Sequence, residues 1–443
     1  MTSLISRFKQ QYHSFIPIKY PEFGKLFYGQ FISNIGSQFS YMALNLLIFD
    51  LVFGLTESTE SATLAMALLA ISTAIPMILI GPWAGVVIDR INRKYSMAGA
   101  NIAQAIAVGF IPFTRYFNID IQIWLILILS FLNSSFARFF FPARGASIPK
   151  LIDDKNELFA ANALSAGAYQ VSALIGPFLA GIVVGLVGYD LPFFIDAISF
   201  ILSALFILSI KTSLYIEQKS EKSPFSDLRD GGLFIISFPP IFYLLIVFSI
   251  LMFAGGASMI LIIPYLQSEM GLVESEPRAF VYGLMIALSA AVGMIFAFYL
   301  SHTKNISRPI RMITFSTVLA GIMLIGFSLS PNIFILVIFW IGFGTIEVSI
   351  SVPLQTITQE TVPDSFRGKI FSFINLSITF SQIIGMGIVS IFASSFLKLR
   401  GSLLLNGVIL LLFSSLGYYF MHKFRLEDLT EVKRQEYYKK QSY

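Results

Sequence analysis

The sequence predicts an all-α membrane protein with twelve transmembrane helices. Hydrophobic residues make up 56% of the 443 positions and charged residues only 12%, about half the charged fraction of an ordinary soluble domain. A bilayer accommodates this composition, because lipid accepts apolar side chains on every face of a helix. The apolar runs are long and continuous, unlike the short alternating segments of a membrane β-barrel.

A spanning helix needs about 20 mostly apolar residues, and the chain contains twelve such stretches. They lie near residues 26–50, 63–88, 96–115, 121–141, 158–187, 191–210, 240–266, 279–301, 310–329, 332–358, 369–396 and 402–421. Charges and turn residues separate them, as at Asp89-Arg90. We expect no cleaved signal peptide, because the residues before Gly24 form no continuous apolar run.

The longest polar segment between the predicted helices, residues 211–232, divides the chain into two halves. We therefore expect a six-helix bundle over residues 1–210, a linker over 211–232, and a second bundle with a short tail over 233–443. A faint repeat relates the halves, since a nearly constant offset separates Pro149, Asn162 and Gln170 from Pro363, Asn375 and Gln382. Two parallel six-helix repeats are a transporter architecture.

Basic residues lie mainly on one side of this topology. If the N-terminus is internal, all but four of the 30 Lys and Arg residues fall on the cytoplasmic side, the four being Arg115, Arg278, Lys398 and Arg400. Positive charge in the connecting loops marks the cytoplasmic side, so both termini are predicted to be cytoplasmic. The net charge of +5 thus reflects topology, and we expect no nucleic-acid partner.

Several kinds of chemistry are disfavoured. The chain has no cysteine, which excludes disulfides and thiolate metal sites. Its three histidines, His13, His302 and His422, all fall at predicted cytoplasmic edges. It has no Gly-rich phosphate loop, no Ser-His-Asp arrangement and no acidic metal cluster. We expect no metal, no cofactor and no catalytic residues, and therefore no enzyme.

The loop between the second and third predicted helices reads Gly85-Val-Val-Ile-Asp89-Arg90-Ile-Asn-Arg93-Lys94. Simple topological anchoring would explain Arg90, Arg93 and Lys94, but it would not explain an acid among them. The spacing resembles the signature loop of the major facilitator superfamily, with Asn92 where glycine is common. By this resemblance we hypothesise that Asp89 contacts the start of the eleventh helix near Arg367-Gly368, where the helix dipole favours an anion.

Other segments resemble one branch of that superfamily, which holds macrolide efflux pumps and the enterobactin exporter. These segments are residues 27–37, Pro142-Ala143-Arg144, residues 194–200, and Val362-Pro363 with Arg367-Gly368-Lys369. The resemblance implies the major facilitator fold, in two six-helix pseudo-repeats. In the fifth helix, Gly176, Pro177 and Gly181 are similar to the family's antiporter motif, although a kinked helix with small packing residues would look the same.

Polar residues recur along the first predicted helix. Gln30, Asn34, Gln38, Tyr41 and Asn45 share one face of it. A polar face within a bilayer must meet protein or a water-filled cavity. Because the first helix of this superfamily lines the central cavity, the resemblance implies a substrate path here. Hydrogen bonding between helices is the alternative.

Three acidic residues lie within predicted spans. Glu347 is near the middle of the tenth helix, where an ionisable group is costly and marks function or packing. It is the first candidate for a proton carrier, with a structural carboxyl as the alternative. Asp196 and Asp50 lie near the outer ends of the sixth and first helices and are further candidates for proton coupling or for the outer gate.

These features favour a secondary transporter that exports an amphipathic, drug- or siderophore-like molecule from a bacterium in exchange for protons, by alternating access. Its expected partners are a small-molecule substrate, protons and the lipid bilayer of the cytoplasmic membrane, and we expect a monomer. Uptake or lysophospholipid flipping by the same fold is one alternative. A membrane sensor or assembly factor is another, although the polar first helix counts against it.

A single cysteine tests the predicted topology. Ser220→Cys places the only thiol of the chain in the 211–232 segment. An impermeant maleimide should leave it unlabelled in intact cells and label it after permeabilisation, whereas Asp120→Cys, in a predicted outer loop, should be labelled in both. Labelling of the Ser220 variant in intact cells would contradict the topology.

Overall fold

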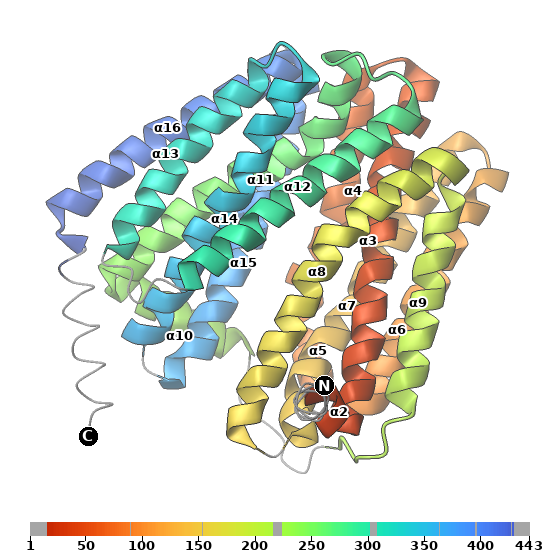
Figure 1. Cartoon of the computed structure of the whole chain (residues 1–443), viewed down its shortest axis with the longest axis vertical. Helices are drawn as coiled ribbons and strands as arrows, with labels where there is room; N and C mark the ends of the chain where they lie inside the picture. Colours follow the sequence, from red (N-terminus) through yellow and green to blue (C-terminus); the bar gives the residue numbers. More distant parts are fainter. Residues whose placement is uncertain are drawn as a thin grey trace, which may run out of the picture. The chain divides into compact units, whose positions relative to one another are not determined.

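The computed structural model describes residues 16–88, 90–152, 154–215, 224–301, 308–362, 364–394, 397–426 and 428. Within these ranges the chain forms α-helices and one short 3₁₀ helix, with no strand (Figure 1). Twelve helical segments in them are long and apolar enough to cross a membrane. The predicted all-α fold class with twelve transmembrane helices is therefore confirmed.

The elements follow one another along the chain with short connections. They are α2 (Ile16–Lys19), α3 (Pro21–Thr56), α4 (Thr59–Leu79), α5 (Gly81–Ile88), α6 (Arg93–Phe110), η1 (Ile111–Tyr116), α7 (Ile119–Leu151), α8 (Lys155–Val187), α9 (Asp190–Leu208), α10 (Pro224–Ser237), α11 (Pro239–Ser268), α12 (Ser275–Ser301), α13 (Pro309–Ser328), α14 (Ile333–Thr361), α15 (Asp364–Ser394) and α16 (Lys398–Lys423).

Asparagine side chains start three of the spanning helices. Asn92 accepts a hydrogen bond from Lys94 N (3.0 Å), Asn118 from Ile121 N (3.2 Å) and Asn332 from Ile335 N (3.1 Å). A helix begins with backbone N–H groups that have no intrahelical acceptor, and an asparagine oxygen satisfies one of them. These caps fix where α6, α7 and α14 begin.

Two differences from the predicted ranges occur at prolines, one where a helix is divided and one where a helix continues. The second predicted helix is divided between α4 and α5, next to Gly81 and Pro82, because proline has no N–H for the helical ladder. The fourth predicted helix was expected to end at residue 141. It continues as α7 through Pro142 and Pro149, since membrane helices tolerate proline within them.

The chain separates into two compact units by its contacts. The first comprises Met1–Leu47 and Ser72–Glu221, and the second Ile48–Ile71 and Lys222–Tyr443. In the first unit α6 packs against α7 and α9. In the second, α11 packs against α15 and α16, α13 against α14 and α16, and α12 against α14. The domain boundaries expected at residues 211–232 stay a prediction.

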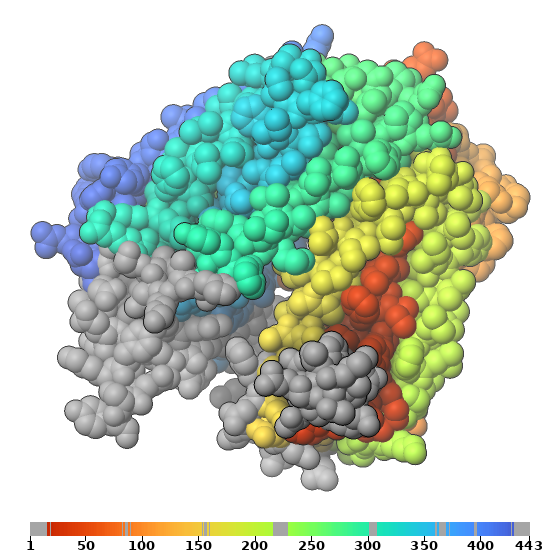
Figure 2. Space-filling model, viewed as in Figure 1, coloured from red at the N-terminus to blue at the C-terminus, as the bar shows by residue number. Residues whose placement is uncertain are grey.

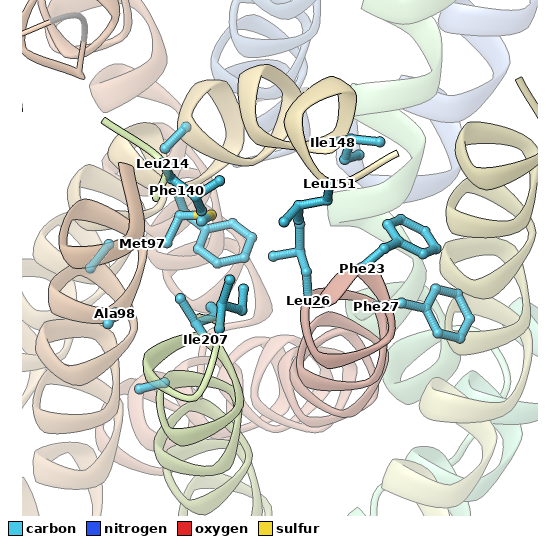
Figure 3. Packing of buried hydrophobic residues seen from close by; sticks show 14 of the residues in the cluster. Phe23, Leu26, Phe27, Met97, Ala98, Phe140, Ile148, Leu151, Ile207 and Leu214 are labelled. Atoms are coloured by element: carbon cyan, nitrogen blue, oxygen red, sulfur yellow. The ribbon is translucent and has the colours of Figure 1, made fainter. Parts of the chain in front are cut away.

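One end of the first unit is held by a cluster of buried apolar side chains drawn from α3, α6, α7, α9 and the segment after α9 (Figure 3). Its members include Phe23, Leu26, Phe27, Met97, Ala98, Phe140, Ile148, Leu151, Ile207 and Leu214. A smaller cluster in the second unit joins α10, α11 and α15 through Ile235, Ile241 and Ile370. Each cluster stabilises the ends of the helices that carry it.

A pair of ionic contacts supports the predicted repeat. In the first unit Lys19 of α2 pairs with Glu157 of α8, and in the second Asp230 of α10 pairs with Lys369 of α15 (2.7 Å). Nearly the same offset separates the two pairs as separates Asn162 from Asn375. The hydrogen bond from the Lys19 ammonium lowers the pKa of Glu157, and the same bond raises the pKa of Lys19.

Large apolar side chains also cover the outside of the helices. Ile295, Phe298 and Tyr299 of α12 are 69%, 69% and 63% exposed. Figure 2 shows α12 on the surface of the second unit and α8 on the surface of the first. Such faces suit contact with lipid chains, which accept apolar groups that water would not.

Glycine allows α12 and α14 to cross closely. A Cβ on Gly344 would lie 1.9 Å from Ser289 O and 3.1 Å from Gly293 N, and a Cβ on Gly293 would lie 2.9 Å from Gly344 O. The obstructing atoms are backbone atoms, so no side-chain rotation could relieve the clash. Small residues at such crossings are how membrane helices gain packing contact.

Gly344→Ala should therefore destabilise the second unit by about 2 kcal/mol, as overpacking does in close-packed interiors. The measurement is the thermal unfolding midpoint of the purified protein in detergent. Gly99→Ala in α6 is the control, because no atom lies within 4 Å of its added methyl group. That variant should be neutral or slightly stabilising. Equal midpoints for the two variants would contradict the close crossing.

Candidate functional site

The polar face of α3 runs through the first unit. Gln30 is buried, Asn34, Gln38 and Asn45 are half-buried, and Tyr41 is 47% exposed. Asn45 Nδ2 donates to Tyr41 O (2.7 Å), while the buried Asn34 Nδ2 has no hydrogen-bond partner. The face is thus enclosed at Gln30 and open at Tyr41. Among these side chains, the amide of Asn34 keeps unused hydrogen-bonding capacity.

The small residues of α8 bring that helix against the polar face. A Cβ on Gly176 would lie 2.4 Å from Gln38 Cβ, so only glycine permits this approach of α8 to α3. Pro177 follows inside the helix, and Gly181 is buried one turn later. The antiporter-like motif therefore positions Gln38, and its role in transport stays a prediction.

Asp196 lies on α9 and is 1% exposed. Ser37 Oγ of α3 donates to its Oδ1 (3.3 Å), and Ser199 Oγ lies 3.4 Å from the same oxygen. The structure thus places Asp196 at the interface between α3 and α9 inside the first unit.

Glu347 lies on an exposed face of α14 in the second unit. Among the described residues it takes part in no hydrogen bond or ion pair. Ser351 and Gln355 follow it at intervals of four residues, which gives α14 a polar face of its own. Sequence reasoning missed Ser351 and Gln355, although their spacing from Glu347 could have indicated them.

Asp50 is paired with a buried arginine. Arg278 of α12 is 1% exposed, and its guanidinium donates to Asp50 Oδ1, to Gln267 Oε1 (2.6 Å) and to Val273 O (2.9 Å). The ring of Phe49 lies 5.3 Å from it, within the range of a cation–π contact. Asp50 therefore neutralises a buried cation and ties the end of α3 to α11 and α12 within the second unit.

The signature loop is described only in part. Asp89 lies outside the described residues, and so do the surroundings of Gly85 and Gly368 and the side chain of Arg367. The predicted contact therefore stays a prediction. Arg90 is exposed. Two further bases of the loop bind backbone carbonyls of the first unit, Arg93 that of Ala146 (2.7 Å) and Lys94 that of Ile210 (2.7 Å), just beyond α9. Cations are favourable at helix C-termini, so Lys94 stabilises the end of α9.

The described residues contain no group of three or more His, Asp or Glu side chains that could hold a metal ion. On the two polar helix faces, the groups available to a ligand are amides, hydroxyls and the carboxyl of Glu347. Such a set can bind a polar organic molecule or a proton.

Residues 26–380 and 304–439 match the family model described as Major Facilitator Superfamily. The uncharacterized MFS-type transporter YfiS of Bacillus subtilis is 25% identical over 374 residues, 81% of this chain and 83% of that protein. Macrolide efflux protein A of Streptococcus pyogenes is 23% identical over 381 residues, which are 84% of this chain and 89% of that protein. The staphyloferrin A transporter of Staphylococcus aureus is 24% identical over 302 residues, which are 68% of this chain and 74% of that protein. These relatives include a macrolide efflux protein, as the motifs predicted, and a siderophore transporter other than the enterobactin exporter.

Solved structures share the fold at low identity. A bacterial homologue of the human lysosomal transporter Spinster, inward-facing and unoccupied, has a TM-score of 0.71 and 13% identity, over 94% of this chain and 98% of that chain. A bacterial homologue of the iron transporter ferroportin, also inward-facing, has a TM-score of 0.67 and 16% identity, over 89% and 99%. At these identities the likeness concerns the fold alone.

The buried ion pair can be tested through stability. Asp50→Asn keeps the size of the side chain but leaves the Arg278 cation buried without its counter-charge, which should cost about 3 kcal/mol. The readout is the thermal unfolding midpoint in detergent. Asp190→Asn is the control. It breaks the ion pair between Asp190 and Arg115, whose side chains are 40% and 55% exposed. Loss of such an exposed pair should lower stability by less than about 1 kcal/mol. Equal losses in the two variants would contradict the role of Arg278.

Proposed function

Because the chain belongs to the Major Facilitator Superfamily, we propose that it is an efflux transporter that exports an amphipathic small molecule in exchange for protons. The observation that carries the proposal is the polar face of α3, from Gln30 to Asn45, within a spanning helix. Lipid offers these amides and hydroxyls no partner, so their retention favours a path that a polar ligand enters.

Export is the direction that the relatives favour. Macrolide efflux protein A of Streptococcus pyogenes is named for efflux of macrolides. The open part of the α3 face, at the half-exposed Tyr41, combines an aromatic ring with neighbouring amides. Aromatic and amide groups together suit a ligand that has both apolar and hydrogen-bonding parts.

The distribution of Lys and Arg gives the proposed orientation. Both termini and residues 211–232 lie on the cytoplasmic side of a bacterial cytoplasmic membrane. Transport proceeds by alternating access, in which the two repeats move about a central site. Each unit has a polar helix face of its own, that of α3 in the first and that of α14, with Glu347, Ser351 and Gln355, in the second.

Coupling to protons is assigned first to Glu347. A carboxyl within a spanning helix is costly when charged, and Glu347 has no ion-pair partner among the described residues. It takes a proton when the site faces outward and releases it when the site faces inward. A substrate that binds better to the anionic form then leaves as the proton enters, which makes the exchange obligatory.

The function is tested first by accumulation of radiolabelled macrolides and amphipathic dyes in a pump-deficient host. Expression of the chain should lower accumulation, and an uncoupler should restore it. Increased accumulation would instead indicate uptake by the same fold. Equal accumulation of every compound with and without the chain would contradict export of this substrate class.

Glu347→Gln tests the coupling step, because it imitates the protonated carboxyl permanently. In vesicles with an imposed pH gradient, this variant should lose uphill transport of a compound found in that screen, down to the level of protein-free vesicles, while it still exchanges the compound down its own gradient. Glu274→Gln, in the exposed loop before α12, is the control and should transport normally. Uphill transport at the wild-type rate by Glu347→Gln would exclude this residue as the proton carrier.

A further inference from the structure

A carboxyl with little exposure and little hydrogen bonding lies between α3 and α9. A Cβ on Gly36 of α3 would lie 2.9 Å from Asp196 Oδ1 and 2.1 Å from Ser199 Oγ, so glycine brings the α3 backbone directly against this group. Three serine hydroxyls surround the carboxyl, those of Ser37 and Ser40 from α3 and that of Ser199 from α9. Asp196 and these three serines are called the serine cage below.

The hydrogen bonds that the serine cage offers Asp196 are long, so they would stabilise an ionised carboxylate only weakly. Hydroxyls bound to a carboxylate anion lie about 2.5–2.7 Å from it, whereas Ser37 and Ser199 lie 3.3 Å and 3.4 Å from Asp196 Oδ1. The Ser199 hydroxyl also donates to the backbone carbonyl of Asp196 at 2.7 Å, and that shorter bond uses its only proton. An anion at Asp196 would therefore depend on the hydroxyls of Ser37 and Ser40 alone, without a charged donor.

No cation compensates the carboxyl among the described residues. α3 faces it with Ser37 and Ser40, and α6 faces α9 with Asn101, which donates to Ser203 (2.8 Å). The basic group of η1, Arg115, pairs with Asp190 at the start of α9. A carboxylate taken out of water without a partner costs several kcal/mol, so the neutral acid is the form that these surroundings stabilise.

Two buried oxygens in the serine cage lack a hydrogen-bond partner. They are Asp196 Oδ2 and Ser40 Oγ, on residues that are 1% and 3% exposed. A proton on Oδ2 gives the acid a hydrogen to donate, and Ser40 Oγ beside it has free acceptor capacity. The neutral acid thus brings its own donor to Oδ2, whereas an ionised carboxylate relies on hydroxyl donors alone.

A metal cation fits the serine cage less well than a proton. Hard cations take six or more oxygen ligands. The serine cage offers one carboxyl and three hydroxyls, and all four residues lie inside continuous helices, where backbone carbonyls are already hydrogen-bonded. The small number of oxygen ligands therefore favours a proton over a metal cation.

We propose that the serine cage is a proton-binding site, distinct from Glu347, in which Asp196 is neutral in the conformation described here and ionises when α3 separates from α9 or water enters. Ser37 lies one turn from Tyr41 on α3, so a change in the serine cage acts on the polar face through a single helix. That this proton contributes to transport rests on the proposed function, whereas its binding does not.

Infrared difference spectroscopy tests proton binding without any substrate. Spectra of the purified protein in lipid vesicles, recorded between acid and alkaline pH, should contain the carbonyl-stretch band of a buried neutral carboxylic acid. Asp196→Asn should remove this band, while Asp190→Asn, on the same helix but in an exposed ion pair, should retain it. Ser40→Ala should shift its frequency without removing it, because the acceptor of the acid proton is lost.

Three outcomes would overturn the proposal. The first is an unchanged set of carboxylic-acid bands in Asp196→Asn. The second is a band that disappears when sodium replaces potassium, which would identify a metal-cation site. The third concerns Ser40→Ala and Ser199→Ala, which are used if Asp196→Asn does not fold. Unshifted carboxylic-acid bands in both of these variants would exclude the serine cage as the proton site.

The transport role has its own readout. Proton uptake by vesicles under a pH gradient should fall in Asp196→Asn relative to Asp190→Asn when a transported compound is present. Normal uptake together with loss of the infrared band would show a proton site that does not couple. Retention of the band in a chain that exports nothing would leave proton binding intact and refute the proposed function.

Discussion

The constraint on which the rest of this structure depends is that a bilayer core offers no hydrogen-bond partner to a polar group. Every spanning segment is helical because only a helix satisfies its own backbone. Serines obey the same rule by bonding to the carbonyl one turn earlier, as Ser172 does with Ala168 (2.9 Å) and Ser414 with Leu410 (2.6 Å). Asn34, Ser40 and Asp196 depart from this rule, because each has a buried polar atom without a hydrogen-bond partner. Lipid gives no reason to keep such atoms, so they indicate a role other than contact with lipid.

α3 carries polar side chains that a helix would not need merely to cross the membrane. Its polar face and its two cage serines belong to the first unit, and Asp50 at its far end belongs to the second. Glycine makes two of its close contacts possible, Gly36 against α9 and Gly176 of α8 against Gln38. A helix held this tightly cannot adjust locally, so a change in the charge of Asp196 or Asp50 acts on the helix as a whole.

Hydropathy and charge were sufficient to predict the twelve spans, because lipid permits few alternatives to an apolar helix. Boundaries were less predictable, since α7 continues through Pro142, where a soluble helix would end. The spacing of four residues indicated the face of α3 but not that Gln30 is buried and Tyr41 exposed. Arg278 was missed as a partner of Asp50 because 228 residues separate them, although the sequence placed both at the outer side. Contacts of that range depend on how helices pack.

The two ion pairs of the leading helices have opposite polarity. In one repeat the leading helix is cationic at Lys19 and the fifth helix anionic at Glu157, and in the other Asp230 and Lys369 reverse the arrangement. If the leading helices exchanged places, Lys19 would face Lys369 and Asp230 would face Glu157. Such an exchange would replace two attractive ion pairs with two repulsive contacts, so the charges of the two leading segments are not interchangeable.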